Sequence, residues 1–385
     1  MIKIVHTADL HLDSPFQMED AAKATERRRE LRETFARLVE DAKAFGANIV
    51  LIAGDLFDRG YVTKNTLDLA VSLFASFPEC KFIISPGNHD FYSPDSVWER
   101  ADLPENVHVF KSESIEKITL ENVGDDNETV NVYGYAFTSQ SFEYSPLPAD
   151  GALCDKSTSE INILCAHADI YSKTTTYCPI STAQIGASGL DYVALGHVHN
   201  GGEVLCENGT WYAYSGSLEP QSFHDCGERG AIFAKLGKEN GKTVLESEFV
   251  PLAKRLYAIE RVNVTGAASA LEINEKVSEL AEKLSYDERT LLRLIVTGDV
   301  SPSAEVQAEA IKAAFPTLFL VEVKDETVPL FDCDYLESDL TIKGAFFREL
   351  LPKLRSQDEY ERAVAAKALR YGLAALSGGE VVDFV

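Results

Sequence analysis

Continuously apolar segments alternate with amphipathic ones through the N-terminal part of the chain. Residues 2–5, 48–53 and 81–85 are apolar and rich in β-branched side chains, as strands buried on both faces are. Between them, residues 21–45 carry apolar side chains at helical spacing, and residues 64–76 fit a second helix. This order of strand, helix, strand, helix, strand predicts parallel βαβ units.

After residue 105 the pattern changes to strands and hairpins. Apolar runs of the buried type recur at residues 161–165 and 192–195. Further strand segments face each other across polar turns within residues 115–135, 202–214 and 230–250.

From residue 253 the alternation of strands and helices restarts. The elements expected there are strand 256–264, helix 267–284, strand 291–297, helix 303–313 and strand 317–324, followed by two helices over 342–376. We therefore divide the chain into an N-terminal domain of residues 1–252, a small α+β domain of residues 253–340 and a helical tail of residues 341–385.

Composition is that of a globular protein, with 45% hydrophobic and 25% charged residues among 385. Residues 1–10 lack the long apolar run of a signal peptide. No segment approaches the roughly 18 consecutive apolar residues of a membrane span. The seven cysteines form no CxxC pair. We expect a cytoplasmic protein with reduced, mostly buried thiols that does not act at a membrane.

The net charge of −25 bears on any role with nucleic acid, because an acidic body repels phosphate backbones at long range. Arg27, Arg28 and Arg29 lie within residues 19–43, where seven basic and seven acidic residues balance, so we expect a solvated face there. The tail is basic although the chain is acidic: residues 341–373 hold seven Lys or Arg against four Asp or Glu, a net charge of +3.

Five polar clusters each follow one of the apolar runs. They are Asp9 with His11, Asp55 with Asp58, the run from Asn88 to Asp90, His167, and His197 with His199. In open α/β sheets, ligands bind in the crevice outside the carboxyl ends of the strands. We therefore expect the five clusters to meet at one rim, where nearby glycines such as Gly54 and Gly87 let the backbone turn sharply.

The residue types of these clusters suit divalent metal ions. Carboxylate, amide and imidazole ligands without cysteine favour manganese, iron or zinc over a thiolate zinc site. A single histidine or a lone Asp-x-His is a weak signal. Here five of the eight histidines of the chain fall in such clusters, which makes a chance arrangement remote.

The clusters, taken together and in order, resemble the signature of the calcineurin-like metallophosphoesterases over residues 1–200. The resemblance implies a four-layer α-β-β-α sandwich. It also implies that a first metal is held by Asp9, His11 and His199. A second would be held by Asn88, His167 and His197, with Asp55 bridging the two.

The same resemblance implies the reaction. Two bridged ions share a hydroxide that attacks the phosphorus in line. His89 is not a ligand in the family pattern and would face the leaving oxygen as a general acid. Asp58 would orient His89; the alternative is that Asp58 caps the next helix.

Two branches of the family compete for the substrate. Gly54 to Gly60 is similar to a box of the Ser/Thr protein phosphatases, in which an arginine, here Arg59, binds the phosphate. Those enzymes carry Glu after the Asn-His pair, whereas this chain has Asp90.

Residues 6–13 and 214–223 look instead like segments of the SbcD-type DNA-repair nucleases, whose capping domain corresponds to residues 253–340. This resemblance implies a manganese-dependent DNA exonuclease or endonuclease that works with an SbcC-like coiled-coil ATPase. A homodimer is a further assembly that we consider.

An apolar stripe on the first tail helix would either dock such a partner or pack on its own domain; it consists of Phe346, Phe347, Leu350, Leu351 and Leu354. Because the chain is acidic, a phosphodiesterase or phosphatase acting on a small molecule or a phosphoprotein is the second hypothesis. A third, an inactive scaffold, predicts the loss of a ligand or of His89, and none is lost.

Overall fold

The computed structural model describes residues 1–376, apart from residues 17, 19, 59–61, 157–158, 302–303 and 331–332. It divides into two compact units, Met1–Leu256 and Tyr257–Val385. The expected capping domain and helical tail thus fall largely within one unit, and the division of the chain into three parts stays a prediction.

The first unit contains two sheets of six strands each. The strands of the first sheet are β1 (Ile2–Thr7), β2 (Ile49–Ile52), β3 (Lys81–Ile84), β4 (Val107–Val109), β11 (Gly230–Glu239) and β12 (Lys242–Pro251). They lie in the order β12-β11-β1-β2-β3-β4, and β1 to β4 run parallel. The parallel units predicted from the apolar runs are therefore confirmed.

The second sheet carries the remaining strands of this unit. They are β5 (Glu116–Val123), β6 (Glu128–Gly134), β7 (Ile161–His167), β8 (Tyr192–Gly196), β9 (Val204–Glu207) and β10 (Thr210–Tyr214). In the order β5-β6-β7-β8-β10-β9 the central four are parallel, and the two edge strands are antiparallel to their neighbours. All three expected hairpins form.

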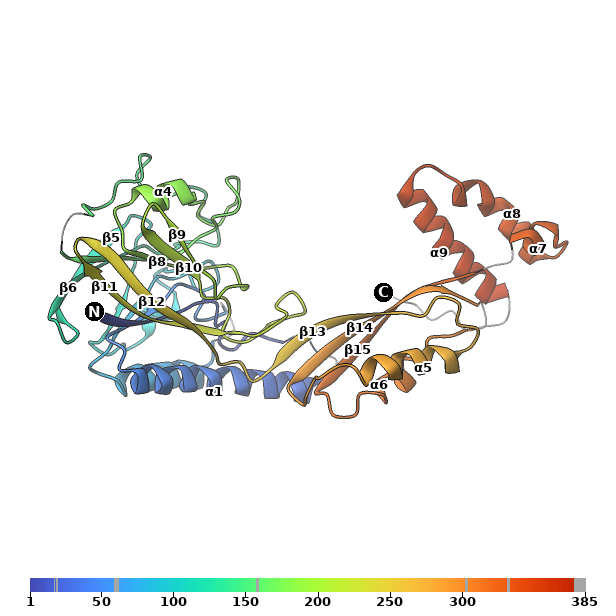
Figure 1. Ribbon diagram of the computed structural model, residues 1–385, viewed down its shortest axis with the longest axis horizontal. Helices are drawn as coiled ribbons and strands as arrows, with labels where there is room; N and C mark the ends of the chain where they lie inside the picture. Colours follow the sequence, from blue (N-terminus) through green and yellow to red (C-terminus); the bar gives the residue numbers. More distant parts are fainter. Residues whose placement is uncertain are drawn as a thin grey trace. The chain divides into compact units, whose positions relative to one another are not determined.

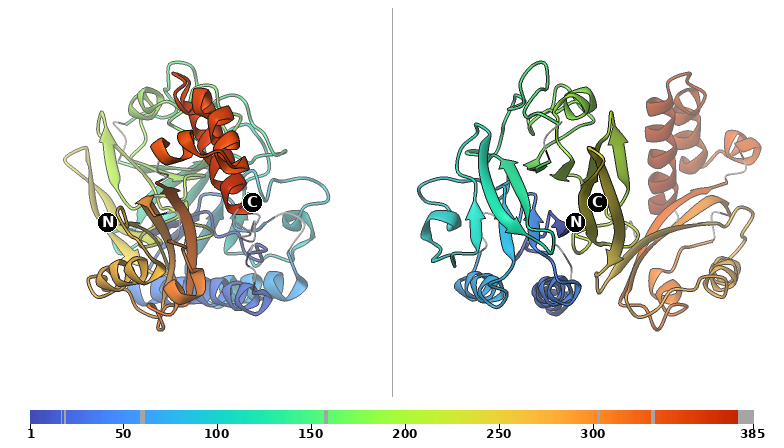
Figure 2. Two further views of the ribbon diagram at one scale, coloured as in Figure 1. Left: turned by 90° about the vertical axis from the view of Figure 1, so that its right-hand side faces the viewer. Right: turned by 60° about the vertical axis from the view of Figure 1, so that its left-hand side comes forward.

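The two sheets pack face to face through an apolar core that includes Ile4 and Ile163. Helices α1 (Ala21–Phe45) and α2 (Lys64–Ala75) cover the outer face of the first sheet (Figure 1, Figure 2). Loops and the short helix α4 (Thr182–Ala187) cover the outer face of the second. The four-layer sandwich is confirmed, with a fourth layer that consists mostly of loops.

Helix α1 spans the residues that its apolar spacing predicts. The Asp20 side chain accepts hydrogen bonds from the N–H groups of Ala22 and Lys23 and so caps the first turn. Gly46 ends the helix with φ at 73°, a left-handed conformation that glycine adopts without strain.

Arg27 contradicts the expected solvated face of α1. It is fully buried, donates to Glu30 and Glu219, and lies over the Phe16 ring with 4.9 Å to the centroid. The Arg29 side chain, by contrast, is 60% exposed. The expectation was wrong for Arg27 because charge spacing along a helix does not show which distant segment folds over it.

The second unit is built on a three-stranded sheet of β13 (Leu256–Asn263), β14 (Thr290–Val300) and β15 (Leu320–Pro329). Helices α5 (Ala270–Ala281) and α6 (Ala308–Lys312) share an apolar core with it (Figure 1). The alternation of strands and helices agrees with the prediction. Helix α6 is shorter than expected, because residues 304–307 are not helical.

Within residues 333–376, three helices follow β15: α7 (Cys333–Ser338), α8 (Ile342–Leu354) and α9 (Glu359–Leu376). In α8, Phe347 is fully buried against Leu369 and Leu373 of α9, and the rest of the apolar stripe packs on this cluster. The stripe therefore packs largely within its own unit.

The prediction omitted α7, α4, β4 and the one-turn helix α3 (Val97–Arg100). In the described part of the chain, no helix is long and apolar enough to cross a bilayer.

Candidate functional site

The loops that follow β1 and β2 are joined by main-chain hydrogen bonds. The Asp9 N–H donates to the Gly54 carbonyl at 3.1 Å, and the His11 N–H donates to the Asp55 carbonyl at 2.9 Å. Across the two sheets, the His197 N–H donates to the Asp9 carboxylate at 3.0 Å. Strand ends of both sheets thus meet at one rim, as their position in the sequence predicted.

The backbone at this rim is held in a conformation that side chains disfavour. Four residues have φ in the left-handed region: Asp9 at 51°, His11 at 47°, Asp55 at 52° and His197 at 101°. Such residues cost on the order of 1–3 kcal/mol each and cluster at functional sites, where the surrounding structure fixes them.

Two glycines allow the loops to approach each other. Gly54 has φ at 93°, and a Cβ there would lie 2.3 Å from the His167 ring. A Cβ at Gly87 would lie 2.2 Å from the Asp55 carboxylate. Any side chain at either position would displace a predicted ligand.

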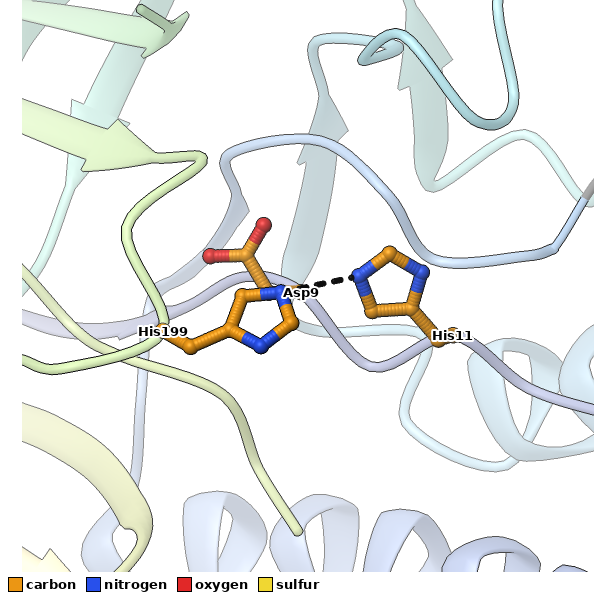
Figure 3. Close-up of side chains that lie close together, drawn as sticks. All are labelled: Asp9, His11 and His199. Carbon is orange, nitrogen blue, oxygen red and sulfur yellow. Dashed lines mark hydrogen bonds between the residues drawn. The ribbon is translucent and has the colours of Figure 1, made fainter. Parts of the chain in front are cut away.

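Asp9, His11 and His199 form one cluster, with ligand atoms that all lie within 4.8 Å of one another. The Nε2 atoms of His11 and His199 are 3.3 Å apart. Figure 3 shows the two rings directed toward each other beside the Asp9 carboxylate. This is the ligand set expected for the first metal.

Asp225, which the sequence analysis missed, orients His199. Its Oδ1 lies 3.1 Å from His199 Nδ1, and its Oδ2 accepts the N–H groups of Gln221 and Ser222. Because a carboxylate only accepts, the proton of a neutral His199 ring lies on Nδ1 and its lone pair is on Nε2. A metal-ligating histidine commonly has a carboxylate partner of this kind.

His167 faces a second group of acceptors. Its Nδ1 donates to the Ala53 carbonyl at 3.0 Å, so the lone pair of the neutral ring is on Nε2. That nitrogen lies 3.0 Å from Asn88 Oδ1 and 3.5 Å from Asp55 Oδ2. Atoms with lone pairs directed at one another repel unless a cation lies between them.

Asp55 lies between the two groups. Its Oδ2 is 3.5 Å from His167 Nε2 and 3.8 Å from His11 Nε2, and its Oδ1 accepts the His89 N–H at 2.9 Å. Burial opposes ionisation, but the His167 and His11 imidazoles hold the pKa of Asp55 below its usual value. Its carboxylate is therefore ionised at neutral pH.

His197 is brought to the site mainly through ring contacts. Its ring centroid lies 5.3 Å from that of His167 and 4.7 Å from that of Tyr177. Burial lowers the pKa of His197 to about 4, so its imidazole is neutral and retains a lone pair. Within the described residues, it belongs to none of the ligand clusters that lie within 4.8 Å.

His89 and Asp58 form an ion pair beside the first cluster. His89 Nδ1 lies 2.7 Å from Asp58 Oδ1, and this hydrogen bond raises the pKa of His89 to about 9. The His89 side chain is 46% exposed, and its ring meets that of His11 edge to face at 4.7 Å. Thr63, not Asp58, caps α2, so the capping alternative for Asp58 is wrong.

Asp90, which is not a predicted metal ligand, holds the loops after β2 and β3 together. Its buried carboxylate accepts the N–H groups of Gly87 at 2.8 Å and Leu56 at 2.9 Å, and also those of Asp55 and Phe57. Burial raises the pKa of Asp90 to about 7, while these N–H donors lower it. Asp90 thereby ties the loop after β3 to the loop after β2.

The donor set fits divalent cations. Ligand atoms about 2.1 Å from an ion and at right angles to each other lie about 3 Å apart, which matches the 3.0 Å and 3.3 Å separations of the facing acceptors. The donors are imidazole nitrogens, carboxylates and an amide oxygen, with no thiolate. Arg59, the expected phosphate ligand, lies outside the described residues.

Comparison with known proteins agrees with this geometry. Residues 2–201 match the family described as calcineurin-like phosphoesterase. An uncharacterized metallophosphoesterase of Bacillus subtilis, YhaO, is 26% identical over 306 residues, which cover 77% of this chain and 72% of that protein.

Two relatives named for DNA repair or nuclease activity are also similar. The DNA double-strand break repair protein Mre11 of Methanopyrus kandleri is 24% identical over 92% of this chain and 77% of its own length. A component of the SbcCD nuclease of Staphylococcus saprophyticus is 24% identical over 74% of this chain and 78% of its own.

Proposed function

The chain belongs to the calcineurin-like phosphoesterase family, whose members use a dinuclear metal site, and it is a hydrolase of phosphoester bonds; from this premise we propose that it is a DNA-repair nuclease of the SbcD type. The similarity to a double-strand break repair protein over 92% of the chain carries the proposal, because that match reaches well beyond the phosphoesterase domain into the second unit.

In this proposal Asp9, His11 and His199 would hold one divalent ion at the rim, and Asn88, His167 and His197 would hold a second. Asp55 would serve both ions as the bridging residue. The position of Asp55 Oδ2, 3.5 Å from His167 Nε2 and 3.8 Å from His11 Nε2, supports this role.

Manganese is the metal we expect, with iron or zinc as alternatives, because the ligands are hard or borderline. When bound, two such ions neutralise phosphate charge and lower the pKa of a water ligand toward neutrality. With Nδ1 of His167 on the Ala53 carbonyl and Nδ1 of His199 on Asp225, the neutral form of each ring presents Nε2 to such ions.

His89 is the proton donor for the leaving oxygen. Its pKa of about 9, set by the hydrogen bond to Asp58, keeps the ring protonated at pH 7. Asp58 holds Nδ1, so Nε2 is the atom that donates. Because the His89 side chain is half exposed, a phosphodiester can reach it.

A partner would supply much of the affinity for DNA, since this chain has a net charge of −25. The second unit exposes apolar side chains that a partner can cover: Leu340 is 96% exposed, Ile342 69% and Tyr360 79%. An SbcC-like coiled-coil ATPase is the partner we propose, with a homodimer as the second assembly. The described cysteines, all of them free thiols, agree with a cytoplasmic location.

The test is a manganese-dependent assay on labelled duplex DNA, single-stranded DNA and bis-p-nitrophenyl phosphate, with and without the ATPase. We expect the enzyme to cleave DNA and the ATPase to increase the rate on duplex. Cleavage of the small ester alone, with both DNA substrates intact in the presence of the ATPase, would refute the DNA proposal. That result would favour a phosphodiesterase or phosphatase acting on a small molecule or a phosphoprotein.

A further inference from the structure

Four charged side chains with little or no exposure join α1 to the end of the first unit. Arg27 donates to Glu30 at 2.7 Å and to Glu219 at 3.0 Å, and Arg255 donates to Glu30 at 2.5 Å. Arg27 and Glu219 are fully buried. With two cations and two carboxylates, the group is electrically balanced, which lowers the cost of its burial.

Glu219 is the member of this group that contacts both α1 and Lys254, near the end of the first unit. Its Oε2 accepts from Arg27, and its Oε1 accepts the Thr34 hydroxyl at 2.6 Å and the Lys254 N–H at 2.6 Å. Two of these donors belong to α1, and the third belongs to the segment that leads out of the first unit. Glu219 therefore fixes its own segment to α1.

The segment that Glu219 fixes is the one that orients His199. Just beyond it, the N–H groups of Gln221 and Ser222 hold the Asp225 carboxylate. Asp225 Oδ1 lies 3.1 Å from His199 Nδ1. On the other side of Glu219, the Ser217 N–H donates to the His199 carbonyl at 3.0 Å.

We propose that Glu219 is a positioning residue of the metal centre, because it anchors residues 215–225 on α1 and so holds Asp225 against the His199 imidazole. The inference rests on the metal-binding role proposed above for His199. A carboxylate partner fixes the orientation of a ligating imidazole, and its loss typically weakens metal binding about 10-fold to 100-fold. Loss of the Glu219 carboxylate would disturb the same contact between Asp225 and His199, but indirectly.

A purely structural role for Glu219 makes a different prediction, and the chain offers a matched control. Asp191 is also fully buried and also paired with a cation, Lys238, at 3.2 Å. Its carboxylate accepts the Asn162 N–H and the Thr243 hydroxyl, and neither of these residues is a predicted metal ligand. If burial of a paired carboxylate were all that mattered, Glu219→Gln and Asp191→Asn would behave alike.

The experiment measures manganese binding to the metal-free full chain by calorimetric titration, for the wild type, Glu219→Gln, Asp191→Asn and Asp225→Asn. We expect Glu219→Gln and Asp225→Asn each to weaken one of two manganese sites about 10-fold or more. Asp191→Asn should lower the melting temperature and leave both affinities within about twofold, since distant sites act independently. In Glu219→Gln, hydrolysis of bis-p-nitrophenyl phosphate should recover as manganese is raised.

Two results would overturn the inference: unchanged manganese affinity in a folded Glu219→Gln protein, or equal losses in Glu219→Gln and Asp191→Asn. Should Glu219→Gln not fold, Thr34→Val removes one donor to Glu219 at little cost in shape, and unchanged affinity there overturns the inference as well. A wild type that binds none of manganese, iron and zinc refutes the proposed site itself, which separates the two failures.

Discussion

The two units of the chain differ in the charged side chains that they bury and in the large apolar side chains that they expose. The first unit buries charged or titratable groups such as Asp9, Asp55, His167 and Glu219. Among the described residues of the second unit, the only buried polar side chains are those of threonines. The described residues of that unit include more exposed large apolar side chains than those of the first, among them Leu340.

Buried charge and exposed apolar surface are retained in proteins for different reasons. Buried charge is costly and is retained where chemistry or precise placement requires it. Exposed apolar surface is retained where another molecule covers it. The contrast agrees with hydrolysis in the first unit and with the contact surface that we propose for the second.

The largest expected effect is that of Asp55→Ala, which removes the side chain between the two acceptor groups. We expect loss of both metals and a fall in phosphodiester hydrolysis of several orders of magnitude, read by metal analysis and initial rates. Asp68→Ala, at an exposed carboxylate paired with Lys64, is the control and should change neither. Full occupancy by two metals in Asp55→Ala would exclude the bridging role.

Next in size is His89→Gln, which removes the proposed proton donor. Both metals and the fold should be retained, while kcat falls about 10²-fold to 10⁴-fold, the usual contribution of general acid catalysis. His224→Gln, at an exposed histidine, should keep wild-type turnover. Normal turnover of a phosphodiester by His89→Gln would remove this residue from the mechanism.

A third pair of variants compares buried and exposed charge on one helix. Arg27→Ala leaves the buried Glu219 without its cation, while Glu30 keeps Arg255, and should cost about 3–5 kcal/mol of unfolding free energy. Arg29→Ala, at an exposed side chain, should stay within about 0.5 kcal/mol. Urea denaturation measures both, and equal losses would contradict the burial of Arg27.

The smallest expected effect concerns the contact surface. Leu340→Glu should keep stability and hydrolysis of bis-p-nitrophenyl phosphate, but weaken binding of the ATPase by about 1 kcal/mol or more, roughly fivefold. Leu271→Glu, on α5 at 66% exposure, tests whether all of the exposed apolar surface matters. Undiminished ATPase binding by Leu340→Glu would place the contact elsewhere.

The fold was largely predictable because its main strands are continuous apolar runs. Strands such as β2 and β7 are buried on both faces, so their composition alone marks them. The missed elements are short: β4 has three residues and α4 has six, too few to establish a period.

The candidate site residues that closely follow a strand, such as Asp9 and His197, could be predicted from the sequence. Asp225 and Glu219 were missed because their partners, His199 and Arg27, are distant in the sequence. No local sequence pattern identifies a carboxylate whose partner comes close only when the chain folds. The same limit explains the error at Arg27.

The pairing of β1 has a consequence for how the protein is made. Ile2 pairs with Leu236 and His6 with Ile232, so one edge of the first strand stays unpaired until β11 has been synthesised. Contacts this far apart in sequence form slowly, and an open apolar edge is a template for aggregation. Nascent or truncated chains that end before residue 230 therefore leave this edge of β1, the strand that precedes Asp9 and His11, open to pairing with other chains.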